Sequence, residues 1–136
     1  MEYIKVFFSW LLTGFLYLMG GLDIALIAFL IAIVLDYLTG IAKAFYLGKV
    51  SSKQGLKGLI KKFEYLVVVA LCVVVDKLLG DTGMIRTMIL YYFVANEGIS
   101  ILENCAKMNV PIPKWLIDKL EQLKDENDGT KEDTQG

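Results

Sequence analysis

The sequence predicts an all-α membrane protein with about four transmembrane helices arranged as two helical hairpins, followed by a C-terminal amphipathic helix and a disordered tail. Of the 136 residues, 56% are hydrophobic, a larger fraction than soluble domains of this size carry. Long apolar segments recur along the chain, and most approach the roughly 20 residues that cross a bilayer as a helix. A lysine-rich connector divides these segments into two pairs, as is typical of a cytoplasmic loop.

The first predicted hairpin consists of residues 3–20 and 23–47. Residues 3–20 are apolar and aromatic, and no charged residue stands between Lys5 and Asp23. A glycine pair interrupts the helix after this segment, and Asp23 is placed to cap the next helix with its carboxylate. The second segment is long enough to cross a bilayer with some tilt.

The second predicted hairpin follows a basic connector, residues 48–62, in which a pair of serines is expected to cap a short amphipathic helix. Residues 63–79 are rich in valine and would suit a buried strand in a soluble protein. In lipid an open strand leaves its backbone groups unpaired, so a helix is predicted. A Gly-Asp-Thr-Gly turn leads to the fourth span, residues 84–103. The transmembrane domain is therefore predicted to cover residues 1–107.

The C-terminal part of the chain is predicted to lie outside the membrane. Two prolines end the membrane part, and residues 108–124 are predicted to form a cytoplasmic amphipathic helix. Its apolar face is made by residues at helical spacing, Leu116, Leu120 and Leu123. Residues 125–136 are polar and are predicted to be disordered.

The distribution of lysines predicts the orientation of the four spans. With tight turns after the first and third spans, both termini and the connector lie on one side of the membrane. The opposite side keeps only Lys77 and Arg86. The positive-inside rule therefore places both termini and the connector in the cytoplasm. The connector lysines that set this topology are Lys49, Lys53, Lys57, Lys61 and Lys62.

Composition argues against several classes of function. The chain has no histidine, and its two cysteines, Cys72 and Cys105, are far apart, which disfavours a zinc site and histidine-dependent catalysis. The formal net charge is −1 and the basic connector lacks interleaved aromatic residues, so no nucleic-acid partner is expected. A lone acid in an apolar span does not specify a reaction. We expect no enzymatic activity, no cofactor and no bound metal.

Asp36 is the most informative residue of the second span. A carboxylate deep in lipid costs at least about 2.5–3.5 kcal/mol, so its side chain should face protein or water. Small residues recur every three or four positions on its helix and favour close helix packing or self-association. This stripe, with one acid and one base, contains Ala25, Ala28, Ala32, Asp36, Gly40 and Lys43. Two interpretations stay open: an intramolecular contact, with Asp36 held by Lys43 or by a hydroxyl such as that of Thr39, or a role facing water or another subunit.

A second polar group lies toward the end of the fourth span. Its members on one helical face are Asn96, Ser100, Glu103 and Lys107, with Glu97 and Asn104 beside them. This polar ridge would line an aqueous path, pair with lysines of the connector, or lie at the cytoplasmic interface if the span ends early. Asp76, Lys77 and Glu64 flank the third span and are interpreted as interfacial anchors.

The order of these motifs resembles the toxin-secretion and phage-lysis holin family, small multi-span proteins of phages and prophages of Gram-positive bacteria. The resemblance covers roughly residues 22–124 and rests on the stretches DYLTGIAKAFYLGKVSSKQGLKGLIKK and NEGISILENCAKMNVPIPKWLIDKL. The matching positions are Asp36, Gly40, Gly48, Ser52, Gly55, Gly58, Asn96, Glu97, Ser100, Glu103, Asn104, Pro111 and Pro113. Asn109 stands where a glycine is common in that family.

The resemblance implies that the chain accumulates in the bacterial cytoplasmic membrane, forms homo-oligomers and opens a large non-selective lesion. An endolysin, or in some relatives a toxin, would pass through it to the cell wall. The residues that would line the lesion or join subunits are Asp36, Gly40, Lys43, Asn96, Glu97 and Ser100. Two other functions stay open: a small ion or proton channel or transporter, and a non-lytic regulatory membrane protein such as an antiholin.

Overall fold

The computed structural model describes residues 1–129 and contains five α-helices in that range, without strands. They are α1 (Glu2–Leu18), α2 (Ile24–Tyr46), α3 (Ser52–Leu78), α4 (Met84–Lys107) and α5 (Lys114–Asn127). The all-helical prediction is confirmed. The predicted disordered tail is wrong at its start, because α5 continues through residues 125–127, and the part beyond residue 129 lies outside the described residues.

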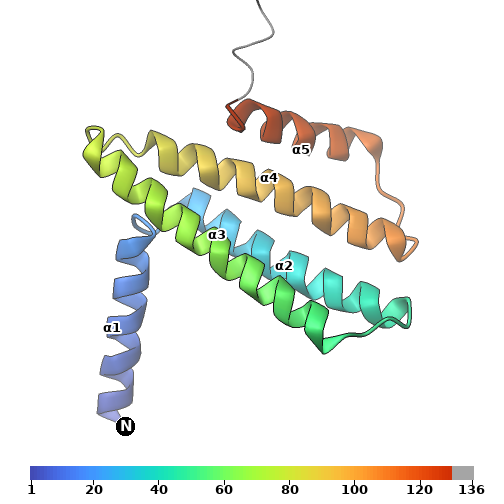
Figure 1. Ribbon diagram of the computed structural model, residues 1–136, viewed down its shortest axis with the longest axis horizontal. Coiled ribbons are helices and arrows are strands. Elements are labelled where there is room, and N and C mark those ends of the chain that lie inside the picture. The colour runs from blue at the N-terminus through green and yellow to red at the C-terminus, as the bar shows by residue number, and fades with distance from the viewer. Residues whose placement is uncertain (130–136) are drawn as a thin grey trace, which may run out of the picture.

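Helices α2, α3 and α4 lie side by side as a bundle in which α4 is central (Figure 1). α4 packs against α2, α3 and α5, whereas α2 and α3 touch each other over only a short length. α1 projects away from the bundle, and no residue between Glu2 and Leu18 is buried (Figure 1). The bundle therefore depends on α4 to hold the other helices together.

The apolar core is small and lies where α2, α3 and α4 meet near the ends of α1 and α3. Its centre is an aromatic stack, in which the Phe93 ring lies 4.3 Å from the Tyr65 ring and 5.8 Å from the Phe29 ring, centroid to centroid. Leu26 and Leu90 are fully buried beside it. The stack joins one aromatic residue from each of the three bundle helices.

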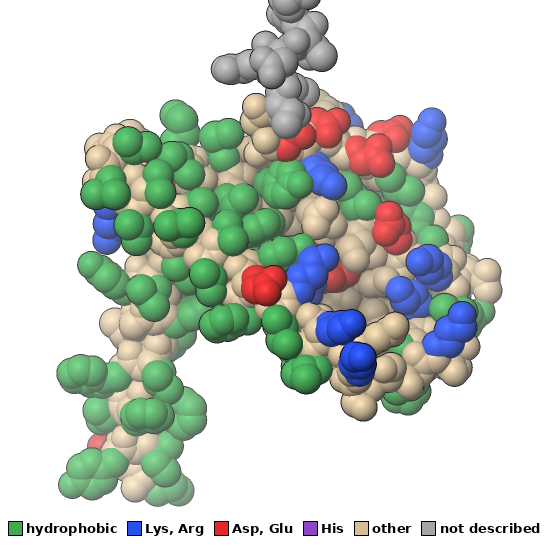
Figure 2. Space-filling view, viewed as in Figure 1, with side chains coloured by type: hydrophobic (Ala, Val, Ile, Leu, Met, Phe, Trp, Pro, Cys, Tyr) green, Lys and Arg blue, Asp and Glu red, His purple; other side chains and the backbone are tan. Residues whose placement is uncertain are grey.

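The outward faces of the helices are apolar. Large hydrophobic side chains stand exposed on several helices, among them Trp10, Phe45 and Leu71. Figure 2 shows them over α1 and over the end of the bundle that carries the turn between α3 and α4, while most Lys and Arg side chains gather at the opposite end. An exterior of this kind is suited to contact with lipid tails.

One helix in residues 1–129, α2, is long and apolar enough to cross a membrane when judged by itself. α1 has 17 residues, and α3 and α4 both carry charged residues along their length. The count of four spans and the cytoplasmic position of the termini therefore stay predictions.

The first half of α3 differs from the predicted connector. The connector was expected to extend from residue 48 to 62 with a short helix of its own, but α3 begins at Ser52 and continues without a break for 27 residues. Ser51 caps it by accepting a hydrogen bond from the Gln54 N–H at 3.4 Å. Gly55 and Gly58 do not end the helix, and Tyr37 from α2 lies against both, with its hydroxyl at Gly55 and its ring at Gly58.

The cap predicted at Asp23 is confirmed, because its carboxylate accepts a hydrogen bond from the Leu26 N–H at 2.9 Å. The helix predicted at the C-terminus also forms, but it does not stand apart from the bundle. α5 runs back along α4, and Leu120 lies over Gly98, where an added Cβ would come within 3.1 Å of the leucine side chain (Figure 1). Lys124 lies over the Tyr92 ring at 5.8 Å.

We expect the substitution Gly98→Val to weaken the docking of α5 on α4. Overpacking of this kind costs about 1–3 kcal/mol, so amide hydrogen exchange in α5 should become roughly tenfold faster in detergent solution. Gly14→Val is the matched control, since nothing lies within 4 Å of a Cβ at Gly14. Unchanged exchange in the Gly98 variant would show that α5 is not held by this contact.

Candidate functional site

Three charged side chains meet between the bundle helices: Asp36 from α2, Lys62 from α3 and Glu97 from α4. The Lys62 ammonium donates to Asp36 Oδ2 at 2.5 Å and to Glu97 Oε2. Glu97 is almost completely buried, with 1% of its side chain exposed, and Lys62 is 12% exposed. We call these three residues the central triad. One cation is shared by two carboxylates, so each helix of the bundle is tied to the other two.

A second set of hydrogen bonds surrounds the acid of α2. Asn104 Nδ2 lies 3.4 Å from Asp36 Oδ1 and donates to Thr39 Oγ1 at 3.1 Å. The Thr39 hydroxyl donates in turn to the Leu35 carbonyl at 2.8 Å. Asn104 is buried, and its amide joins α4 to α2 one helical turn beyond Asp36. These bonds satisfy polar groups that would otherwise be costly inside the bundle.

The central triad lies near the middle of α2. Asp36 follows Ile24 by twelve residues and precedes Tyr46 by ten, which corresponds to about 18 Å and 15 Å along the helix axis. A bilayer core is about 30 Å thick, so a helix that crosses it from end to end carries Asp36 close to the midplane. Ion pairing inside the protein is then the alternative to a bare charge in lipid.

Neither predicted partner, Lys43 or Thr39, binds the Asp36 carboxylate in the described chain. That carboxylate is held by Lys62, which the sequence analysis treated only as a topology lysine, and no ion pair with Lys43 occurs in the described chain. Thr39 binds Asn104 rather than the carboxylate. For Glu97 the geometry agrees with the alternative in which the polar ridge pairs with a connector lysine.

The remaining predicted site residues lie at different places. Asn96 is not a member of the central triad and donates to the Tyr65 hydroxyl at 3.4 Å. Ser100, Gly40 and Lys43 line a cleft beside the triad. In the small-residue stripe, Ala25 and Ala32 are buried and Ala28 is half-buried, in the helix that packs most extensively on α4. Ala25 and Ala32 thus pack within one molecule.

A second buried polar cluster lies at the end of the bundle next to α1. Arg86 from α4 forms a bidentate pair with Asp23, with distances of 2.7 and 3.1 Å, and also donates to the Met19 and Gly21 carbonyls. Gly20, with φ of +86°, approaches so closely that an added Cβ would lie 2.5 Å from Arg86 Nε. Arg86 therefore fastens the turn between α1 and α2 onto α4.

Asp76 is not the interfacial anchor that the sequence analysis described. Only 3% of it is exposed, and its carboxylate accepts hydrogen bonds from the Ile85 and Arg86 N–H groups at 3.0 and 2.8 Å. Gly83 precedes α4 and has no side chain to cap it, so an acid from the end of α3 takes that role. The signal for this cluster was present in the sequence, since Asp23 follows the first predicted hairpin turn and Arg86, of opposite charge, follows the second.

We expect Lys62→Met to destabilise the bundle by about 3 kcal/mol, because it leaves two carboxylates without a cation. Thermal unfolding followed by circular dichroism in detergent measures this loss. Lys57→Met, an exposed position of the same helix, is the control. Adding Asp36→Asn and Glu97→Gln to Lys62→Met should recover most of the stability, since no unpaired charge remains. No recovery would mean that packing rather than charge holds the three helices.

The pairing with Arg86 lowers the pKa of the Asp23 carboxyl below its ordinary value. A lowered pKa in the folded state means that this stabilisation is complete at neutral pH and is lost as the pH falls through the folded-state pKa. We expect Asp23→Asn, which keeps the cap, to reduce the free energy of unfolding by about 1 kcal/mol at pH 7, since the carboxylate is half exposed. The difference from the unsubstituted chain should shrink as the pH falls below the ordinary aspartate pKa of 3.8. A difference independent of pH would contradict the ion pair.

Comparison with known proteins places these features in a family. The sequence matches the family model described as Bacteriophage holin family over residues 13–125. It is 47% identical to an uncharacterized 14.9 kDa protein in the nagH 3′ region of Clostridium perfringens, over 90% of this chain and 93% of the relative. It is 44% identical to an uncharacterized protein of Clostridium perfringens strain 13, over 91% and 93%.

A relative with a functional name is more distant. The chain is 30% identical to a probable holin of Bacillus phage phi105, over 70% of each sequence. No solved structure matches the chain.

Proposed function

The chain belongs to the bacteriophage holin family, and from this premise we propose that it is a phage or prophage holin that oligomerises in the bacterial cytoplasmic membrane. There it opens a large non-selective lesion that lets an endolysin or a toxin reach the cell wall. The resemblance to the probable holin of phage phi105 supports this assignment. The protein acts without catalysis and takes itself and the bilayer as partners.

The observation that carries the proposal is the inverted distribution of polarity in the bundle. Charges are shielded inside by the central triad, whereas the outward faces are apolar. A chain of this kind is stable in lipid as a closed bundle. If the three helices separate, the charged side chains of the central triad form a surface that can face water between neighbouring copies.

We further propose four spans with both termini and the α2–α3 loop on the cytoplasmic side. The lysines of the α2–α3 end support this orientation through the positive-inside rule. α1 is the first span in this arrangement, and its turn onto α2 is fixed by Arg86. The outer side of the membrane then carries the Arg86–Asp23 cluster, and the cytoplasmic half carries the basic end.

Induced expression in a Gram-positive host tests the function. A holin should release a cytoplasmic reporter enzyme abruptly after a delay, because the lesion passes folded proteins. Leakage of ions with the enzyme retained would indicate a channel instead, and neither event would indicate a regulatory membrane protein. Expression level is matched by immunoblotting in every arm.

We expect Asp36→Leu to insert normally but to shift the time of enzyme release at matched expression by at least about twofold. The substitution removes one carboxylate from the central triad and changes the balance between the closed bundle and its separated helices. Leu35→Ala, at an exposed position one residue earlier, is the control. Unchanged timing in the Asp36 variant would remove this residue from the mechanism.

A further inference from the structure

A cleft of about 460 Å³ lies between the second half of α2 and the first half of α3, with α4 as its floor. Residues of α2 and α3 form its two sides, and both helices also contact α4. Three glycines stand among the side chains of its walls: Gly40, Gly55 and Gly58. The cleft extends from the loop end of the bundle down to Asp36 of the central triad.

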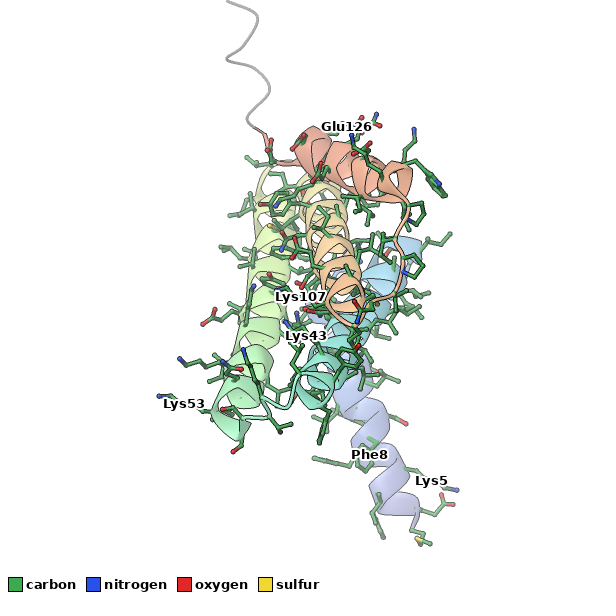
Figure 3. The ribbon with its side chains drawn as sticks, turned by 90° about the vertical axis from the view of Figure 1, so that its right-hand side faces the viewer. Lys5, Phe8, Lys43, Lys53, Lys107 and Glu126 are labelled. Atoms are coloured by element: carbon green, nitrogen blue, oxygen red, sulfur yellow. The ribbon has the colours of Figure 1, made fainter. Side chains whose placement is uncertain are left out.

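The lining of the cleft is strongly basic. Its ionisable residues are Lys43, Lys49, Lys61, Lys62, Lys107 and a single acid, Asp36. Figure 3 shows Lys43 and Lys107 at the gap between α2 and α3, whereas Lys53 points outward from the far side of α3. Five lysines against one acid leave a large excess of positive charge on a chain whose formal net charge is −1.

This positive charge is not neutralised by the described part of the chain. Of the cleft lysines, Lys62 alone takes part in an ion pair within residues 1–129. The N-terminus of α3 adds to the potential, because Ser51 and Gln54 line the same cleft and the positive end of the helix dipole lies there. A cleft of this size and charge is suited to a phosphate group.

The surroundings of the cleft favour a phosphate that carries hydrocarbon chains. The neighbouring outward faces of α2 and α3 expose Phe45, Leu56 and Leu59. A phospholipid has the same pairing of a phosphate with apolar chains, whereas a free phosphate ion makes no use of an apolar border. Each lysine close to an anionic lipid surface adds to its attraction.

We propose that this cleft binds the head group of an anionic phospholipid from the cytoplasmic leaflet, with its phosphate between Lys43 and Lys107. The site rests on the proposed membrane location and orientation of the chain. A lipid bound there adds a contact between the second half of α2 and the end of α4. It also lies above the central triad and favours the closed bundle.

Native mass spectrometry of the full chain in neutral detergent, titrated with phosphatidylglycerol or phosphatidylcholine, tests the site. We expect one tightly bound phosphatidylglycerol per chain and much weaker binding of phosphatidylcholine. The double variant Lys43→Gln with Lys107→Gln should lower the affinity for phosphatidylglycerol roughly twenty-fold, since each lysine contributes about a factor of five.

The control variant carries Lys53→Gln and Lys57→Gln, which remove the same charge from the same end of the bundle but outside the cleft. Its affinity should stay within about twofold of the unsubstituted chain. Equal losses in both variants would overturn the site in favour of diffuse attraction. If the first pair perturbs folding, as judged by circular dichroism, Lys49→Gln with Lys107→Gln gives the same comparison at two exposed positions.

Inorganic phosphate alone is a separate arm of the experiment. Complete displacement of phosphatidylglycerol by millimolar phosphate would assign the cleft to a free anion and overturn the lipid. Binding is also independent of lysis. A chain that binds phosphatidylglycerol in the cleft but releases no enzyme contradicts only the proposed function. A chain that lyses cells but does not prefer phosphatidylglycerol contradicts only this site.

Discussion

The shared ammonium of Lys62 is the interaction on which the bundle depends. It contacts carboxylates from two other helices inside the bundle, where Glu97 is almost completely buried and a lost hydrogen bond leaves a charge without a partner. Apolar packing between helices provides little driving force in lipid, because lipid tails are as apolar as the side chains they replace. A charge that requires a partner therefore specifies the register of the three helices more strongly than the small aromatic core does. The same charge also allows the three helices to separate, because separated helices can turn their ionised groups toward water.

α4 is the element that packs against α2, α3 and α5. Arg86 holds the α1–α2 turn near its start, Glu97 contacts Lys62 at its middle, and Asn104 binds α2 near its end. α3 is joined to this frame through Lys62, through the contact of the Tyr65 and Phe93 rings and through the cap that Asp76 provides. α2 and α3 touch each other over only a short length, at the Lys62–Asp36 pair and where Tyr37 lies against Gly55 and Gly58. The basic cleft is formed by all three bundle helices and not by an irregularity of one of them.

Local signals could be predicted from the sequence, whereas pairings across the bundle could not. The Asp23 cap depends on three neighbouring residues, and the start and end of α2 lie within one residue of the predicted bounds. The sequence does not distinguish Lys62 from the other four connector lysines, because the rotation of α3 against α2 decides which lysine faces Asp36. The turn after Asp76 brings the start of α4 back to the Asp76 carboxylate. The hydrophobic pattern alone does not predict this contact. The docking of α5 also needs a three-dimensional partner, since an amphipathic face does not specify what covers it.

The position of α5 has a consequence for assembly. Its contacts with Gly98 and Tyr92 lie nine and fifteen residues before the end of α4, about 14 and 23 Å along the axis. A helix as polar as α5 cannot occupy hydrocarbon at that depth, so full immersion of α4 and attachment of α5 exclude each other. Detachment of α5 uncovers Gly98, where the backbone of another helix could approach closely. In the proposed homo-oligomer, release of the C-terminal segment and association of subunits would be thermodynamically linked, each lowering the free-energy cost of the other.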